Sequence, residues 1–413
     1  MIAAAQLTPT SRRRGQSVRL SPLLCWALLL VLFLNGCASV RRLTSRESRP
    51  GSTKLTARLV VVPARIVGNH FIVEARWDKS GPWRFLVDTG SAVTLVSPEF
   101  ASAHGILQSP NVSPPVRIRS ADGRTVALPS VNIRRIQLSD AHFRNIPGFV
   151  YDCSELSAHL GVRVDGILGF PLFRDVIFSL DYPQSRLVIT TAGPTPLIPG
   201  SRIPFNNERR TPIIPLQLGN ETFLALIDSG SDGSLMLNPF GLHPEFEYGP
   251  RAGGTVGTLT GDRPQQIGRL RQPLVIGAYT LEQPIVDLTD QLSSIGGEIL
   301  RHFCVTFDPP RNNVTFYRDT TAVIAPDARR SSGLSFTKTP AYWRVAGVVP
   351  DSPAAELGIQ RGELVARING EPVSAWPLTR LDSLIRRARE ITFTFIRGER
   401  EVPVIIPTFE LIP

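Results

Sequence analysis

The chain has 413 residues and a formal net charge of +10, with 42% hydrophobic and 19% charged residues. These values exclude an intrinsically disordered chain, which would combine low hydrophobicity with a high net charge, and the length allows two to four domains. The 33 Gly and 36 Pro residues follow no G-X-Y period, which excludes collagen. Nucleic acid is not expected as a partner, because the basic residues do not gather with aromatic residues on one face.

The first 36 residues are predicted to be a lipoprotein signal peptide. Arginines precede an unbroken apolar run, Leu23–Leu34, which is shorter than the roughly 20 residues of a membrane span and typical of a signal peptide. The run ends in Leu34-Asn35-Gly36-Cys37, which resembles the bacterial lipobox and implies cleavage before Cys37 and its modification with acyl chains such as palmitate. A plain secretory signal or a short uncleaved anchor is the alternative. Residues 37–56 are predicted to form a flexible tether.

This N-terminus predicts a protein of the bacterial cell envelope, bound to the membrane by the lipid on Cys37. Ala38-Ser39 contains no Asp retention signal, which favours the outer membrane, facing the periplasm. For Cys153 and Cys304 the sequence leaves two readings open, a disulfide or two buried free thiols. The six His residues are scattered, and no C-x-x-C or H-E-x-x-H motif is present, so we expect no metal site.

Residues 57–192 and 200–318 are predicted to be two copies of one β-rich unit. The segment WRFLVDTGS at 83–91 is matched 140 residues later by FLALIDSGS at 223–231. Each copy continues with an apolar strand and then with a hairpin, turning at Asp122-Gly123 in the first copy and at Gly261-Asp262 in the second. Landmarks that recur in the same order indicate an internal repeat. The last landmark pairs Ile167-Leu168-Gly169 with Ile299-Leu300.

The repeated triads Asp88-Thr89-Gly90 and Asp228-Ser229-Gly230 predict a catalytic pair of carboxyl groups. An apolar strand leads into each triad, and glycine permits a tight turn there. Two carboxylates about 3 Å apart share one proton. The ionised group can then take a proton from water while the protonated group polarises a carbonyl. The alternative for 228–233 is a turn or cation loop, although the Glu that an EF-hand needs at its twelfth position is absent.

From Leu59 to Tyr317 these features resemble the aspartic protease family, with both halves fused in one chain. The resemblance implies a mainly β, two-lobed aspartic protease β-barrel fold with pseudo-twofold symmetry, Asp88 and Asp228 as the catalytic pair, and no cofactor. It also implies a flap over the substrate at Asp122-Gly123. The two copies depart from the family pattern, because the first flap lacks a Tyr and no Gly follows Ile299-Leu300.

The resemblance further implies that residues next to the two Asp support the pair. Thr89 and Ser229 are expected to hydrogen-bond across the two loops, and Ser91 and Ser231 to donate to the carboxylates. Such donation lowers a pKa, so we expect an acidic optimum. The predicted supporting set is Thr89, Gly90, Ser91, Ser229, Gly230 and Ser231.

Residues 333–408 resemble a PDZ domain. The most specific stretch is SPAAELGIQRGELVARING at 352–370, and a helix with one apolar face is predicted after it, near residues 378–388. The resemblance implies that Gly333-Leu334-Ser335-Phe336 binds a peptide C-terminus while the peptide adds a strand to the sheet edge. Two alternatives remain for this loop. The Gly333–Phe336 loop can be vestigial, so that the domain only packs on the protease, or the peptide can bind at a loop near Ala341–Val345 instead.

The sequence therefore predicts a lipid-anchored aspartic endopeptidase. Its expected partners are polypeptide substrates, peptide C-termini at the PDZ domain, and the membrane through the lipid on Cys37. Two alternatives remain open. One is a non-catalytic peptide-binding or scaffold lipoprotein that retains the protease fold, and the other is a protease for a single precursor.

Overall fold

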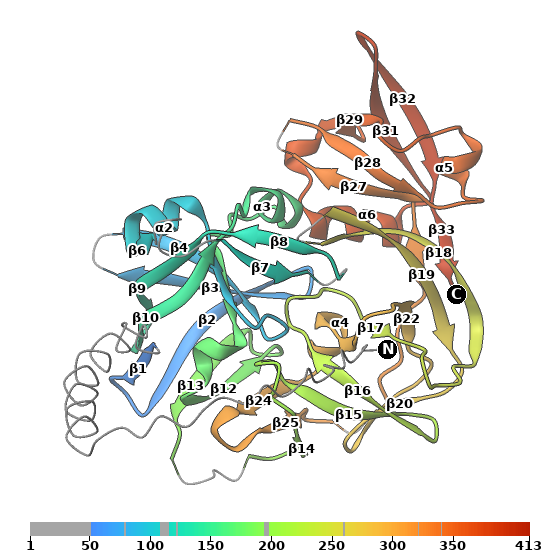
Figure 1. The fold of residues 1–413 in the computed structure, drawn as a ribbon. Coiled ribbons are helices and arrows are strands. Elements are labelled where there is room, and N and C mark those ends of the chain that lie inside the picture. The colour runs from blue at the N-terminus through green and yellow to red at the C-terminus, as the bar shows by residue number, and fades with distance from the viewer. Residues whose placement is uncertain are drawn as a thin grey trace, which may run out of the picture. The chain divides into compact units, whose positions relative to one another are not determined.

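The computed structural model describes residues 51–77, 80–107, 115–120, 123–193, 198–258, 261–320, 322–339 and 341–413. The predicted signal peptide, Cys37 and Asp122 lie outside the described residues. The described chain is mainly β, as predicted, and Figure 1 shows two strand-rich lobes followed by a C-terminal domain. No closed barrel is found in this part of the chain, where each sheet follows an open strand order.

Lobe 1 contains thirteen strands in the described residues, and short turns connect most of them. Its elements are β1 (Ser52–Leu55), β2 (Leu59–Val67), β3 (His70–Trp77), β4 (Ser80–Asp88), β5 (Thr94–Val96), α2 (Pro98–His104), β6 (Gly105–Leu107), β7 (Val116–Arg119), β8 (Thr125–Leu128), β9 (Ser130–Leu138), β10 (Ala141–Val150), α3 (Ser154–Leu160), β11 (Gly166–Gly169), a 3-10 helix (Phe170–Phe173), β12 (Val176–Asp181) and β13 (Arg186–Thr191).

Lobe 2 repeats this order with a longer hairpin. Its elements are β14 (Ser201–Pro204), β15 (Ile213–Leu218), β16 (Glu221–Ile227), β17 (Leu235–Leu237), β18 (Phe246–Thr258), β19 (Gly261–Leu270), β20 (Leu274–Ile276), β21 (Tyr279–Leu281), β22 (Ile285–Leu288), β23 (Ser293–Ile295), α4 (Gly297–Leu300), β24 (Cys304–Asp308), a 3-10 helix (Pro309–Arg311) and β25 (Asn313–Tyr317).

Strand pairing supports the predicted repeat. In lobe 1, β11 runs parallel to β4 and antiparallel to β5. In lobe 2, β23 runs parallel to β16 and antiparallel to β17. The same mixed pattern of a parallel and an antiparallel neighbour recurs in both lobes, and it places the strands before Asp88 and Asp228 in equivalent positions.

The two lobes share a sheet and a core. Strand β12 of lobe 1 pairs antiparallel with β24 of lobe 2. Across this pair the rings of Phe178 and Phe307 stack with centroids 4.8 Å apart, and the hydroxyls of Ser179 and Thr306 lie 2.7 Å apart. One cluster of buried apolar side chains includes residues of both lobes. The lobes are therefore joined by backbone pairing and by buried aromatic area.

The predicted tether is wrong at its C-terminal end. Residues Ser52–Leu55 form β1, which pairs with β10, and a guanidinium N–H of Arg174 donates to the carbonyl of Gly51. The Ser, Thr and Lys residues here gave no apolar signal to reveal a strand, because β1 is an edge strand with no fully buried side chain.

The C-terminal domain consists of a six-stranded sheet, two short helices and a flanking strand pair. Its elements are β26 (Arg329–Ser331), β27 (Leu334–Lys338), β28 (Trp343–Val348), α5 (Pro353–Glu356), β29 (Leu364–Ile368), β30 (Glu371–Pro372), a 3-10 helix (Val373–Ala375), α6 (Leu378–Arg387), β31 (Glu390–Arg397), β32 (Arg400–Pro407) and β33 (Phe409–Ile412). The sheet order is β27-β28-β29-β31-β32, with β30 paired to β29. Helix α6 carries the apolar face predicted from the sequence and packs through Leu381 into the domain core.

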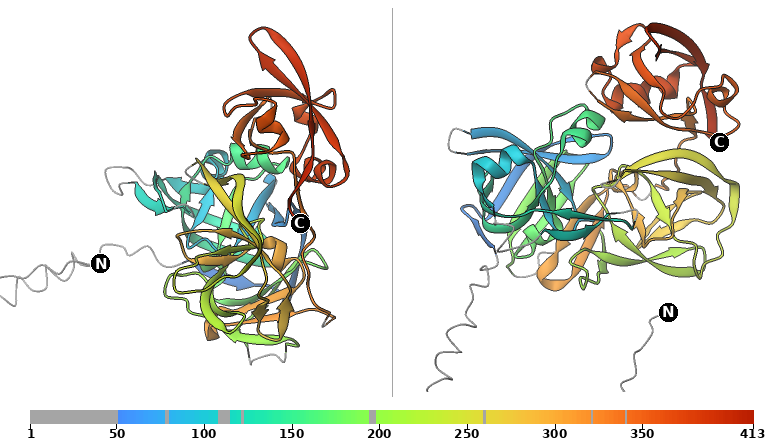
Figure 2. Two further views of the ribbon diagram at one scale, coloured as in Figure 1. Left: turned by 90° about the vertical axis from the view of Figure 1, so that its right-hand side faces the viewer. Right: turned by 45° about the horizontal axis from the view of Figure 1, so that its top comes forward.

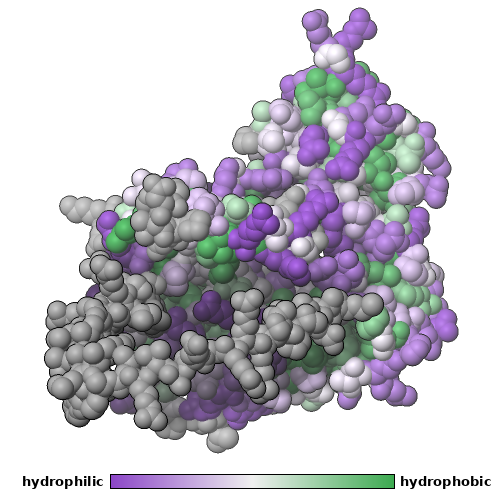
Figure 3. Space-filling view, viewed as in Figure 1, coloured by the Kyte–Doolittle hydropathy of each residue, from purple (hydrophilic) through white to green (hydrophobic). Residues whose placement is uncertain are grey.

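The end of the chain leaves this sheet and contacts lobe 2. Strand β33 pairs with β26, and Leu411 and Ile412 pack with Ile267 and Ile285 of lobe 2. The buried guanidinium of Arg269 donates to the carbonyl of Pro413 at 2.5 Å. By contrast, the turn between β31 and β32 projects as a hydrophilic tip at the top of Figure 3.

Candidate active site

The two repeated Asp residues lie at the ends of equivalent strands. Asp88 ends β4, where it pairs with Gly169 of β11, and Asp228 follows β16, with its backbone N–H donating to the carbonyl of Ile295 at 2.9 Å. Both carboxyl groups are half-buried. The strand ends thus hold the two groups at fixed backbone positions.

Glycine at the third position of each triad lets the carboxyl groups meet. A Cβ atom at Gly230 would lie 2.6 Å from both carboxylate oxygens of Asp88, and one at Gly90 would lie 2.6 Å from Cγ of Asp228. Each carboxylate therefore packs against the glycine of the other lobe. The structure brings together the predicted pair, and no larger residue fits at either glycine without moving a carboxylate.

Thr89 and Ser229 form the hydrogen bonds expected between the loops. The Thr89 N–H donates to Ser229 Oγ at 3.0 Å and the Ser229 N–H donates to Thr89 Oγ1 at 3.1 Å. In addition, Thr89 Oγ1 donates to the carbonyl of Ile227 at 2.7 Å, and Ser229 Oγ donates to that of Val87 at 2.8 Å. Both side chains are buried. The four bonds obey the pseudo-twofold relation and fix one loop against the other.

The predicted roles of the Ser91 and Ser231 hydroxyls are wrong. The Ser91 hydroxyl donates to the carbonyl of Val93 at 2.8 Å, while its backbone N–H donates to Asp88 Oδ1 at 3.0 Å. The Ser231 hydroxyl accepts the N–H of Gly233 at 3.3 Å. Backbone N–H groups of the tight loops supply donors to the carboxylates, so the side-chain argument for an acidic optimum does not hold.

The environment raises the pKa of both carboxyl groups. Burial, the charge of Asp228 and a hydrogen bond with Asp228 raise the pKa of Asp88 well above its ordinary value, against a lowering effect of the Gly90 and Ser91 N–H groups. Burial also raises the pKa of Asp228, whereas donation from Gly230 and from Asp88 lowers it. The pair therefore shares one proton.

The apparent departure in the second copy comes from a wrong alignment of the repeat. The counterpart of Gly169 is Gly296, which directly follows β23, rather than the position after Ile299-Leu300. The equivalence extends to the next residue, because the Phe170 N–H donates to the carbonyl of Ser91 and the Gly297 N–H to that of Ser231. A Cβ at Gly169 or Gly296 would press on the catalytic loop beside it. Both copies therefore keep the glycine.

Two features near the carboxyl pair were not predicted, a contact of Asn69 and the burial of Tyr182. Asn69, in the left-handed turn between β2 and β3, donates from Nδ2 to the carbonyl of Asp232 at 2.9 Å, which braces the lobe 2 loop from lobe 1. Tyr182 is buried with no hydrogen-bond partner for its hydroxyl in the described chain. Burial and the charges of Asp228 and Asp88 raise the pKa of Tyr182. The Gly68-Asn69 turn signal was present in the sequence, but nothing there linked it to the distant loop.

The predicted flap forms a hairpin of β7 and β8, paired from Val116↔Leu128 to Arg119↔Thr125. Of its predicted tip, Asp122 lies outside the described residues. Gly123 adopts a positive φ of 80° and lies against the side chain of Gln291 in lobe 2. A groove of about 260 Å³ lies between the hairpin and lobe 2, lined by Arg124, Arg263, Pro264, Leu288, Thr289, Asp290 and Gln291.

The predicted PDZ loop runs into β27, the edge strand of its sheet. The Gly333 N–H donates to Ser331 Oγ at 2.9 Å, and the Ser335 hydroxyl accepts the N–H of Thr255 from lobe 2 at 3.0 Å. Leu334 is buried, and Phe336 packs against Trp343 with ring centroids 5.4 Å apart. Ala341 follows β27 near the other end of this strand, in the turn before β28.

The two remaining cysteines are free thiols, so the disulfide reading is excluded. Cys153 is buried and Cys304 partly buried. Burial raises the pKa of Cys153 to about 12 and that of Cys304 to about 11. Within the described ranges, no group of three or more His, Cys, Asp or Glu side chains is placed to hold a metal ion. In the same part of the chain, no helix is long and apolar enough to span a membrane.

Comparison with known proteins agrees with this geometry. Residues 73–172 match the family model of an aspartyl protease, and residues 344–397 match that of a PDZ domain. A search of the curated proteins found no match. The chain thus contains an aspartyl protease domain and a PDZ domain. The first match includes Asp88, whereas Asp228 lies beyond it, and the internal repeat and the structure relate the two.

Replacing Gly230 with alanine should displace the Asp88 carboxylate, because the new methyl group would lie 2.6 Å from both of its oxygens. We expect proteolytic turnover of unfolded casein to fall by about 10²–10⁴-fold, the range lost when a general acid or base is misplaced. Gly233→Ala is the matched control, since the nearest atom to its Cβ lies 3.6 Å away. Equal turnover in the two variants would contradict the packing argument.

Asp88→Asn should raise the melting temperature near neutral pH. A raised pKa in the folded state contributes stability that is complete below the pKa of an unfolded Asp, about 4, and is lost as the pH rises through the folded pKa. Asparagine does not ionise and so avoids that loss of stability. The melting temperature of Asp88→Asn should therefore exceed that of the wild type near pH 7 and equal it towards pH 4. Thermal unfolding at both pH values measures this. Asp152→Asn is the control, because a hydrogen bond from Ser154 lowers the pKa of Asp152. A pH-independent difference for Asp88→Asn would refute the assignment.

Proposed function

We propose that the protein is an aspartic endopeptidase that hydrolyses polypeptides with a water molecule activated by Asp88 and Asp228. The observation that carries the proposal is the reciprocal packing of each carboxylate against the glycine of the other triad. The four hydrogen bonds between the Thr89 and Ser229 loops hold that arrangement. A turn loop or a cation loop would not require a second, symmetry-related copy.

We assign the role of general acid to Asp88 and that of general base to Asp228. Asp88, whose pKa is raised well above its ordinary value, carries the shared proton and donates it towards the carbonyl oxygen of the scissile bond. Asp228 is ionised and accepts a proton from the water whose oxygen attacks the carbonyl carbon. When the tetrahedral intermediate collapses, the C–N bond breaks, the leaving nitrogen takes up the proton from Asp228, and a hydroxyl of the intermediate returns its proton to Asp88. The pair needs no covalent intermediate, and the other product is a carboxylic acid.

The substrate is proposed to be an extended polypeptide between the carboxyl pair and the β7–β8 hairpin. The groove lined by Arg124 of the hairpin turn and by residues of lobe 2 offers space for a chain beside the hairpin tip. The PDZ domain is proposed to bind peptide C-termini along β27, an edge strand that can accept one more strand.

The location is proposed from the sequence alone. The apolar run Leu23–Leu34 followed by Leu34-Asn35-Gly36-Cys37 supports export and lipid attachment at Cys37. We place the mature protein in the bacterial cell envelope, at the outer membrane facing the periplasm.

Unfolded casein incubated with the protein at pH 4–7 should be cleaved, and a statine-type peptide should inhibit the cleavage. Asp88→Asn and Asp228→Asn should each lower turnover by about 10²–10⁴-fold, because each removes one proton-transfer group. Asp152→Asn, an exposed carboxyl outside the pair, should keep wild-type turnover. If both dyad variants cleave casein as fast as the wild type, the dyad assignment is wrong. If no form cleaves casein, a peptide-binding scaffold or a protease for a single precursor is favoured.

The intact mass of the protein extracted from membranes checks the lipid anchor. We expect a chain that begins at Cys37 and carries acyl groups. Cys37→Ser should block both processing and acylation and leave the unprocessed mass. A wild-type protein that retains residues 1–36, or that begins elsewhere without lipid, would contradict the proposal.

A further inference from the structure

The unpaired edge of β27, here called the β27 edge, is where a peptide would add to the PDZ domain under the proposed function, on which this inference rests. Strand β27 has β28 as its only partner in the described sheet. Apolar side chains of β27 and α6, including Leu334, Phe336, Leu381 and Ile385, belong to one cluster. A ligand on this edge would therefore run between β27 and α6.

Helix α3 of lobe 1 already lies against both of these elements, as Figure 1 and the two views in Figure 2 show. Gly161, which ends α3 in a left-handed conformation (φ 68°), touches Pro377 directly before α6. A Cβ atom at Gly161 would lie 2.9 Å from Cα of Pro377. The backbones of Gly161 and Pro377 are in contact here, so no space remains for a bound peptide between them.

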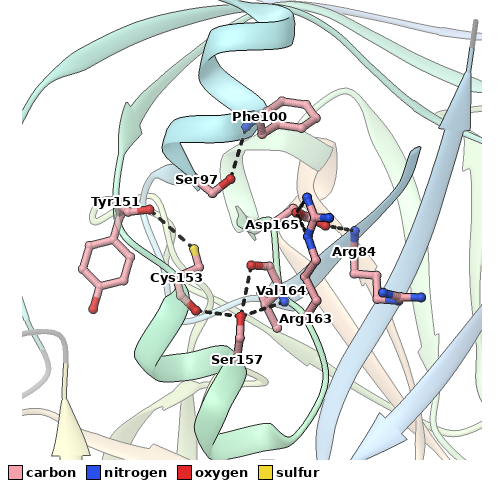
Figure 4. Close-up of polar contacts among 9 residues, drawn as sticks. All are labelled: Arg84, Ser97, Phe100, Tyr151, Cys153, Ser157, Arg163, Val164 and Asp165. Carbon is pink, nitrogen blue, oxygen red and sulfur yellow. Dashed lines mark hydrogen bonds and ion pairs between the residues drawn. The ribbon is translucent and has the colours of Figure 1, made fainter. Parts of the chain in front are cut away.

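Helix α3 is firmly anchored in lobe 1. Figure 4 shows that the Ser157 hydroxyl donates to the carbonyl of Cys153 at 2.7 Å and accepts the N–H of Val164 at 2.9 Å. The carboxylate of Asp165, directly before β11, accepts two hydrogen bonds. The backbone N–H of Arg84 donates to Oδ2 at 2.8 Å, and the Nε–H of Arg163 donates to Oδ1 at 2.6 Å. Leu160 is fully buried in lobe 1. The contact is therefore broken more easily by movement of the PDZ domain than by unfolding of α3.

The contact carries an energetic cost at the end of β27. Lys338 is only 4% exposed, and its ammonium has no hydrogen-bond partner among the described residues, although it lies 4.4 Å from the ring centroid of Trp343. Burial lowers the pKa of Lys338 to about 8. On the α3 side, burial and the charge of Lys338 lower the pKa of His159 to about 4. Release of the contact would return both groups to water, which favours opening.

The other side of the PDZ domain is held by lobe 2. The Thr255 N–H of β18 donates to Ser335 Oγ at 3.0 Å, and Thr337 Oγ1 donates to Asp262 of β19 at 3.3 Å. The domain therefore contacts both lobes at once, lobe 1 through α3 and lobe 2 through the β18–β19 hairpin.

We propose that α3 and a peptide C-terminus compete for the β27 edge, so that the PDZ domain binds its ligand only after it has separated from lobe 1. The measured affinity for a peptide then equals the intrinsic affinity reduced by the fraction of molecules that are open. While the closed form predominates, a change that weakens the contact between α3 and α6 strengthens peptide binding by the same factor.

The test uses the full chain and a variant that forces α3 and α6 apart. Gly161→Asn keeps the left-handed backbone, which Asn tolerates, but its side chain collides with Pro377. Gly358→Asn is the matched control, with a φ of 71° and no atom within 4 Å of its Cβ. The probes are twenty fluorescein-labelled octapeptides that differ only in the last residue, each with a free or an amidated C-terminus. Binding is followed by fluorescence anisotropy.

We expect the best free-carboxylate peptides to bind Gly161→Asn at least tenfold more tightly than the wild type or Gly358→Asn. Equal affinity for all three proteins would overturn the competition while leaving peptide binding by the PDZ domain intact. Binding to none of them would instead show that the proposed peptide-binding function is wrong.

Hydrogen exchange of the wild type provides a measurement that needs no variant. A saturating free-carboxylate peptide should increase deuterium uptake over residues 155–161, because the PDZ domain no longer covers α3, and its amidated twin should not. Unchanged uptake in α3 with bound peptide would overturn the competition. Casein turnover in the same samples reports the protease separately.

Discussion

Two carboxyl groups that face each other repel when both are ionised, and burial increases this repulsion. The architecture around Asp88 and Asp228 keeps them together despite that cost. Hydrogen bonds of Thr89 and Ser229 cross from one loop to the other, and Gly90 and Gly230 remove the side chains that would separate the groups. The same repulsion makes the pair retain a proton, which is the state that general acid and base chemistry requires.

The pairing is possible because the lobes are connected well beyond the site. Strands β12 and β24 join the lobes through backbone hydrogen bonds, and Phe178 stacks on Phe307 across the junction. Asn69 adds a contact from lobe 1 to the loop that follows Asp228. These contacts limit the relative motion of the lobes near the carboxyl pair, where an error of 1 Å would change the proton sharing.

The sequence predicted the parts of the fold that depend on local patterns. Apolar strands, the hairpin turns and the two Asp triads repeat at a nearly constant offset, so the pairing of Asp88 with Asp228 followed from symmetry. The hydroxyl of Ser91 could not be oriented in this way, since its partner depends on the exact course of a loop that also offers the carbonyl of Val93. Sequence comparison does not reveal Gly296 as the counterpart of Gly169, because Ile299-Leu300 is more similar to Ile167-Leu168 than Ser294-Ile295 is. The contact of α3 with the PDZ domain joins segments about 180 residues or more apart in sequence and left no local pattern.

The two hairpins of the repeat differ in length, and this difference has a consequence for symmetry. Strands β7 and β8 of lobe 1 have 4 residues each, whereas β18 and β19 of lobe 2 have 13 and 10. In a dimer of identical subunits, every element appears twice and both hairpins would have to be the same. Fusion of the copies in one chain removes that restriction. One hairpin can stay short beside the groove while the other grows into a platform for an added domain, so the second half of the gene can acquire a new partner without a matching change in the first.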